Sequence, residues 1–165
     1  MSTDERLSSL LQERRARLQA LDAGAFEALS AGPIGPHLDR LLAASDYAWE
    51  QLCKRPALMA QLLQPEPEPA LESLDEAAAM AALRRYRHAE SVRQIARDVA
   101  GLDAVQDTVR ASAVLADRCC QLALEYAMAV LMARHGQPRS REGAPQALVV
   151  FGLGKQGGSE LNFSS

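Results

Sequence analysis

The sequence lacks long apolar runs and is poor in aromatic residues, which make up 4% of its 165 residues. Because a membrane-spanning helix needs about 20 consecutive apolar residues, none is predicted. The first residues include acids where a signal peptide would carry basic residues and then an apolar stretch. Basic and acidic residues number 18 and 21, a balance unlike that of a nucleic-acid or membrane-surface protein. We therefore expect a cytoplasmic globular protein whose partners include neither nucleic acid nor a membrane.

Side chains that bind metals are also few. The cysteines are Cys53, Cys119 and Cys120, and their spacing fits neither a disulfide framework nor a zinc site. Cys119 and Cys120 would point about 100° apart on a helix, so they cannot converge on one ion. The three histidines are widely separated in the sequence. No metal site is predicted within the chain.

Alanine and leucine are abundant, which favours helices in the N-terminal part. Ser2 and Glu5 have the spacing of a capping box, and leucines at three- and four-residue intervals predict an amphipathic helix over residues 2–21. Glycine and proline then interrupt the pattern. Shorter helical segments are expected at residues 22–29, 38–52 and 57–63.

A proline- and glutamate-rich stretch follows, with proline at every second position from Pro65 to Pro69. Alternating proline removes backbone donors and favours an extended chain. We predict a linker at residues 64–72 that joins an N-terminal helical segment (residues 1–63) to a pair of long helices (residues 73–136). A ligand for a proline-recognising domain is the alternative.

The two long helices carry their own start and stop signals. Ser73 and Glu76 form a second capping-box pattern, which predicts a helix from residue 73 to about residue 100. Gly101 suits a left-handed C-terminal cap, and Asp103 is expected to cap the next helix, which ends near Arg134. Long helices joined by a short turn predict an antiparallel pair within a helical bundle.

A row of charged residues runs along the first of these helices. It consists of Arg84, Arg87, Glu90, Arg93 and Arg97. One interpretation is a solvated face with ion pairs worth under about 1 kcal/mol each, and the other is a face that docks on a catalytic sheet. In both cases we expect the face to be exposed in this chain.

The last segment, residues 146–165, changes character. Residues 147–151 are apolar and predict a buried strand, which a glycine-rich turn follows. One strand cannot make a sheet, so these residues are expected to begin a truncated α+β domain. The predicted fold is therefore mostly α: a helical bundle, followed by the first strand and turn of that domain.

The turn contains Gly152-x-Gly154-x-x-Gly157, in which glycine lets backbone donors approach a phosphate closely. This spacing matches the dinucleotide-binding fingerprint, which also needs a helix, a second strand and an acidic residue about 20 positions on. A truncated dinucleotide-binding domain is thus one alternative. A tight connection without a ligand is another.

The string Gly-Leu-Gly-Lys-Gln-Gly-Gly-Ser-Glu-Leu-Asn-Phe-Ser-Ser at residues 152–165 is long and specific. It resembles the segment before the active site of glutamine synthetase adenylyltransferase/adenylyl-removing enzymes, which are bifunctional members of the nucleotidyltransferase superfamily. The resemblance includes the arginine-rich helix from residue 82 onward and the sequence of residues 136–140. In that family an Asp-Ile-Asp-Leu element that holds Mg²⁺ comes next, so the metal-binding carboxylates are expected beyond Ser165.

The resemblance implies nucleotide or phosphate binding by Gly157, Gly158, Ser159 and Ser165. It places no catalytic residue within the chain, and we expect this N-terminal fragment to be inactive alone. The sequence of residues 159–165 resembles that of the N-terminal catalytic domain of the bacterial enzyme. That domain removes AMP from a glutamine synthetase tyrosine by phosphorolysis, giving ADP. Implied partners are glutamine synthetase, a PII-type signalling protein of nitrogen metabolism, ATP, ADP and phosphate. The alternative is a helical module that docks glutamine synthetase or the PII-type regulator.

Overall fold

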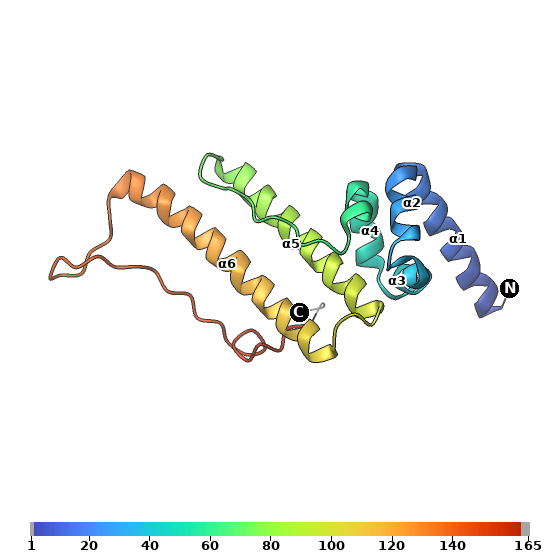
Figure 1. Cartoon of the computed structure of the whole chain (residues 1–165). Helices are drawn as coiled ribbons and strands as arrows, with labels where there is room; N and C mark the ends of the chain where they lie inside the picture. The colour runs from blue at the N-terminus through green and yellow to red at the C-terminus, as the bar shows by residue number, and fades with distance from the viewer. Residues whose placement is uncertain (1, 163–165) are drawn as a thin grey trace. The chain divides into compact units, whose positions relative to one another are not determined.

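The computed structural model describes residues 2–162, which are mostly helical. Its elements are α1 (Thr3–Leu21), α2 (Ala23–Ala31), η1 (Gly35–His37), α3 (Leu38–Ala44), α4 (Asp46–Lys54), η2 (Pro56–Gln61), α5 (Glu76–Val99) and α6 (Val105–His135) (Figure 1). No helix within the described residues is long and apolar enough to cross a bilayer. The predicted helical character of the chain is confirmed.

The chain forms two compact units that share its long helices. The first unit contains the residues up to Glu66 together with His88–Thr108. The second unit contains Pro67–Arg87 together with the residues from Val109 onward. Each of α5 and α6 therefore contributes residues to both units.

The N-terminal helix begins as its sequence predicts. The Ser2 hydroxyl accepts a hydrogen bond from the Glu5 N–H at 3.2 Å, and the Glu5 carboxylate accepts one from the Ser2 N–H at 2.6 Å. Both bonds of the predicted capping box are thus present. Asp22 then separates α1 from α2, because its carboxylate accepts the Ala25 N–H at 2.9 Å.

Two predicted helix boundaries are wrong, each because a short polar side chain caps a helix there. The single helix expected over residues 38–52 is interrupted at Ser45, whose hydroxyl accepts the Ala48 N–H at 3.1 Å and starts α4. The expected start at Ser73 is also wrong. The Asp75 carboxylate accepts the Ala78 N–H at 2.8 Å, and α5 begins at Glu76.

The turn between α5 and α6 combines a confirmed prediction with a corrected one. Gly101 has the predicted left-handed conformation, with φ of +69°. Asp103, expected to cap α6, binds Arg97 through both carboxylate oxygens, and α6 begins at Val105. The hydrogen bonds from the Arg97 guanidinium lower the pKa of Asp103 below its usual value.

The core of the first unit lies between α1–α4, η2 and the second half of α5. Its largest fully buried side chains are Leu18, Ile34, Leu38, Leu41, Leu42, Leu52, Met59 and Val92. Arg14 is a charged residue in this interior, and its guanidinium donates to the Leu42 carbonyl and to Asp46. It also lies 4.8 Å from the centroid of the Trp49 ring, where the cation faces the aromatic π-system.

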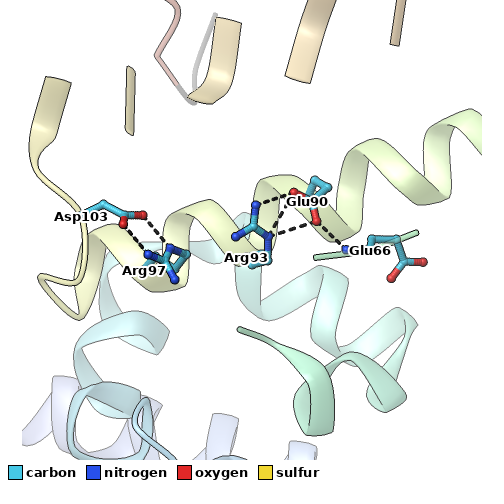
Figure 2. A network of polar contacts seen from close by, with 5 residues as sticks. All are labelled: Glu66, Glu90, Arg93, Arg97 and Asp103. Atoms are coloured by element: carbon cyan, nitrogen blue, oxygen red, sulfur yellow. Dashed lines mark hydrogen bonds and ion pairs between the residues drawn. The ribbon is translucent and has the colours of Figure 1, made fainter. Parts of the chain in front are cut away.

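Glu90, in the predicted charged row, is buried rather than exposed. Arg84 and Arg87 are exposed as expected, but Glu90 is only 6% exposed. Its carboxylate accepts three N–H bonds from Arg93 at 2.6–3.0 Å and the backbone N–H of Glu66 at 2.6 Å (Figure 2). The expectation of an exposed face is therefore wrong at Glu90, because the start of the linker covers it. It is also wrong at Arg93 and Arg97, which are half-buried in ion pairs with Glu90 and Asp103.

The linker is extended, and arginines hold its glutamates. Arg55 pairs with Glu66 at 2.6 Å in the first unit. In the second unit, Arg118 binds Glu68 through both of its carboxylate oxygens. The segment has no regular secondary structure from residue 65 to residue 70, as alternating proline predicts.

The second unit is built on the first half of α5 and most of α6. Its small core consists of Leu71, Ala79, Ala82 and Leu122. Tyr126 packs against this core, and its hydroxyl donates to the Leu74 carbonyl at 3.0 Å, so the end of α6 lies beside the start of α5. Within this unit the two helices are antiparallel, as predicted.

Replacing Glu90 tests how much its burial matters. We expect Glu90→Ala to lower the free energy of unfolding by about 2–3 kcal/mol, because Arg93 and the Glu66 N–H lose a shared acceptor. Glu90→Gln keeps one acceptor oxygen and should cost less. Urea denaturation of these variants, with the exposed Glu27→Ala as the matched control, measures the effect. Equal losses for Glu90→Ala and Glu27→Ala would contradict the prediction.

Candidate functional site

The segment before the glycine-rich turn does not form the predicted strand. Apart from an isolated bridge between Arg139 and Pro145, the described residues contain no β-pairing. Residues 147–151 consequently lack a backbone partner, and strand hydrogen bonds come only in pairs of strands. Residues 148–150 are 60–63% exposed and Phe151 is 83% exposed. The prediction of a buried strand is therefore wrong for the chain as it stands.

Residues 152–160, the glycine loop, follow this segment and fold back on themselves. The N–H groups of residues 157–160 donate to the carbonyls of residues 153–156 at 2.8–3.5 Å. The loop thus brings the predicted phosphate-binding residues Gly157, Gly158 and Ser159 together. Their N–H groups, however, are occupied within the loop. The fourth predicted residue, Ser165, lies outside the described residues.

Close contact with the backbone requires glycine at position 157 of the loop. A Cβ atom on Gly157 would lie 2.5 Å from the Gly152 carbonyl oxygen, closer than a side chain allows. At Gly158 the nearest atom would be 3.5 Å away, an ordinary contact. Ser159 has φ of +56°, a left-handed conformation that is unfavourable for a residue with a side chain.

Gln156 attaches the glycine loop to α6. Its side-chain amide donates to the Ala113 carbonyl at 3.3 Å and also to Asp117 Oδ1. Residues 113 and 117 are one helical turn apart on one face of α6, so a single amide group reaches both. The sequence pattern singles out neither Gln156 nor Asp117, because the contact joins residues 39 positions apart.

A hollow of about 430 Å³ lies between the apolar segment and α6. Its walls include Asp117, Cys120, Gln121 and Leu124 from α6 and residues 148–150 from the segment. Gln156 and Gly152 close one part of it. The attachment of the loop is therefore at the edge of this hollow.

No group of three or more His, Cys, Asp or Glu side chains that suits a metal ion occurs within residues 2–162. The printed sequence also contains no Asp-x-Asp. The Mg²⁺ ligands that the sequence resemblance implies are thus not among these residues, and no metal-dependent step can be built from them.

This helical chain with its glycine loop matches the model of a family of adenylyltransferases, over residues 36–165. The family is described as glutamate-ammonia ligase adenylyltransferase, and the chain belongs to it. This confirms the resemblance found in the sequence and extends it upstream from residue 82 to residue 36.

Curated relatives agree with the family match, and each is named bifunctional glutamine synthetase adenylyltransferase/adenylyl-removing enzyme. The relative from Stenotrophomonas maltophilia K279a is 49% identical over 79% of this chain and 14% of its own length. The one from Xanthomonas oryzae pv. oryzae MAFF 311018 is 42% identical over 96% of this chain and 17% of its own length. The one from Thioalkalivibrio sulfidiphilus is 38% identical over 78% and 15%.

The chain therefore spans only 14–17% of the length of these relatives. No solved structure matches it.

The exposed apolar segment predicts self-association. The unpaired backbone N–H and C=O groups of this apolar segment can pair with those of a second copy. We therefore expect the 165-residue chain to form dimers or larger species as its concentration rises. A chain shortened by residues 146–165 should elute as a monomer at the same concentration. Size-exclusion chromatography compares the two. Monomer elution of both chains would remove the pairing hypothesis.

The two neighbouring glycines give a matched test of the loop. We expect Gly157→Ala to destabilise the closed loop by about 1–2 kcal/mol, because the new Cβ meets the Gly152 carbonyl. Endoproteinase Lys-C should then cut after Lys155 on the order of tenfold faster, with Lys54 as the internal reference. Gly158→Ala should change the rate little. Equal cleavage rates for the two variants would show that the loop is not closed as described.

Proposed function

We propose that this chain is part of an enzyme that regulates glutamine synthetase by removing AMP from one of its tyrosines. In the proposed reaction, orthophosphate attacks the phosphorus of the tyrosine-linked AMP. The bond to the tyrosine oxygen breaks, the tyrosine regains its hydroxyl, and ADP leaves. The family match through the glycine loop carries this proposal, and the words adenylyl-removing in the names of the relatives support it.

We assign the chain to the adenylyl-removing activity rather than to the adenylyl-adding one. The sequence of residues 159–165 supports this assignment, because it resembles that of the N-terminal catalytic domain in the family. Gly157, Gly158, Ser159 and Ser165 are the proposed contacts to the phosphates of ADP and to orthophosphate. Mg²⁺, ATP and a PII-type regulator belong to the same proposal. They rest on the resemblance alone.

We further propose that the 165 residues are catalytically inactive by themselves. Nucleotidyl transfer of this kind uses a pair of carboxylates to place metal ions across the reacting phosphorus. The printed sequence has no Asp-x-Asp to supply that pair. The phosphate-binding residues alone would bind a product without transferring the nucleotidyl group.

A second candidate function is a helical module that docks glutamine synthetase or a PII-type protein. It is favoured by an apolar groove of about 620 Å³ along α5 and α6 in the second unit. Met80 and Leu131, which line this groove, are half-exposed. An apolar groove between helices is a common site for a partner helix.

Activity and binding assays separate these candidates. We expect the protein encoded by the complete open reading frame to release ADP from adenylylated glutamine synthetase only when phosphate is present, and the 165-residue chain to release none. Binding of adenylylated glutamine synthetase to the 165-residue chain, measured by calorimetry, would support the docking function. Phosphate-independent release of AMP by the complete protein would contradict phosphorolysis.

A further inference from the structure

In this structure the Gln156 amide is bonded to Asp117, and the glycine loop has a conformation that does not offer its N–H groups to a ligand. A phosphate cradle needs backbone N–H groups that point at the anion and have no other acceptor. In the closed loop, the N–H groups of residues 157–160 already donate to carbonyls of residues 153–156. A phosphate can reach the N–H groups of Gly157 and Gly158 only after these bonds open.

We propose that Asp117 and Gln156 form a latch that keeps the glycine loop closed and thereby opposes the binding of phosphate-bearing ligands. The inference rests on the proposed function of the loop as a phosphate-binding element. The latch consists of the two hydrogen bonds from the Gln156 amide to α6, one to the Asp117 carboxylate and one to the Ala113 carbonyl.

The shape of the loop supports this role. Gly152 lies against the stem of Gln156, and a Cβ atom there would be 2.9 Å from Gln156 Cγ. The same glycine offers the carbonyl that Gly157 approaches. Gly152 and Gly157 therefore allow the loop to close over the aliphatic part of the Gln156 side chain.

Charge acts in the same direction. Asp117 brings a carboxylate to the loop at the place where the Gln156 amide is held. A phosphate beside the closed loop would meet this negative charge, and like charges at short range repel. Release of Gln156 removes the loop from that carboxylate as it frees the N–H groups, so both effects favour ligand binding in the open state.

The population of the open loop sets the expected size of the effect. When only a fraction of the molecules is competent to bind, the apparent Kd exceeds the intrinsic Kd by the inverse of that fraction. Weakening the latch should lower the apparent Kd for ADP and the KM for phosphate by about three- to tenfold, with kcat unchanged within about twofold.

The test uses variants of the protein encoded by the complete open reading frame. Gln156→Glu places a second carboxylate against Asp117 and should open the latch, as should Asp117→Ala. The double variant Q156E/D117N exchanges acceptor and donor at constant net charge, so it should return the KM for phosphate toward the wild-type value. Gln137→Ala and Asp107→Ala, which remove the same side-chain types elsewhere, are the controls.

A second readout, independent of activity, makes the outcome decisive. Lys-C cleavage after Lys155 in the 165-residue chain should accelerate in Gln156→Glu and slow again in the double variant, independently of any activity. An unchanged KM for phosphate in the opened variants would overturn the latch. A raised KM would overturn it as well, since the contact would then position the loop for its ligand.

The failure of the proposed function would be recognised separately. If the wild-type protein released no ADP, phosphorolytic deadenylylation would be excluded, and calorimetric titration with ADP would decide the latch. Tighter ADP binding by Gln156→Glu than by wild type supports it, whereas equal or weaker binding, or no binding by any of the proteins, overturns it.

Discussion

The buried carboxylate of Glu90 fixes the course of the chain through the first unit. A buried ion pair is costly to desolvate and adds little stability unless its hydrogen bonds are satisfied. Here three bonds to Arg93 and one from the Glu66 N–H use the carboxylate fully. The bond to a backbone N–H is the specific one, because it selects where the extended linker leaves the unit. Arg55 forms an ion pair with the side chain of Glu66. The linker is therefore held at Glu66 through both the backbone and the side chain of this residue.

Local sequence patterns predicted the local features well. The capping box at Ser2 and the left-handed Gly101 involve atoms within a few residues of one another, so spacing alone identifies them. The break at Ser45 was missed because an apolar stripe continues across it, and a capping hydroxyl wins over that pattern. The burial of Glu90 could not be predicted from its helix, whose spacing suits a solvated face equally well. It depends on the linker, 24 residues away in the sequence.

The candidate site divides in the same way. The motif identified which residues form the glycine loop, since the close approach at Gly157 is a local need for glycine. It did not identify the hydrogen-bonding state of their N–H groups, which depends on how the loop closes. The contact of Gln156 with α6 cannot be predicted from a local sequence pattern, because it joins residues far apart in the sequence. A strand likewise needs a partner strand. Residues 147–151 have the composition of a strand, yet without a neighbour they have no regular secondary structure and are exposed.

The exposed segment and the closed loop meet at Gly152, and this links their states. The carbonyl of Gly152 faces Gly157, and its Cα approaches the stem of Gln156. Pairing of residues 148–151 with another strand would straighten the backbone that leads into this glycine. Because the closed loop depends on close contacts on both sides of Gly152, a small displacement there loosens the approach to Gly157 and the seat of Gln156 together. We therefore expect burial of the apolar segment to favour exposure of the loop N–H groups, an exposure that the proposed latch at Asp117 opposes.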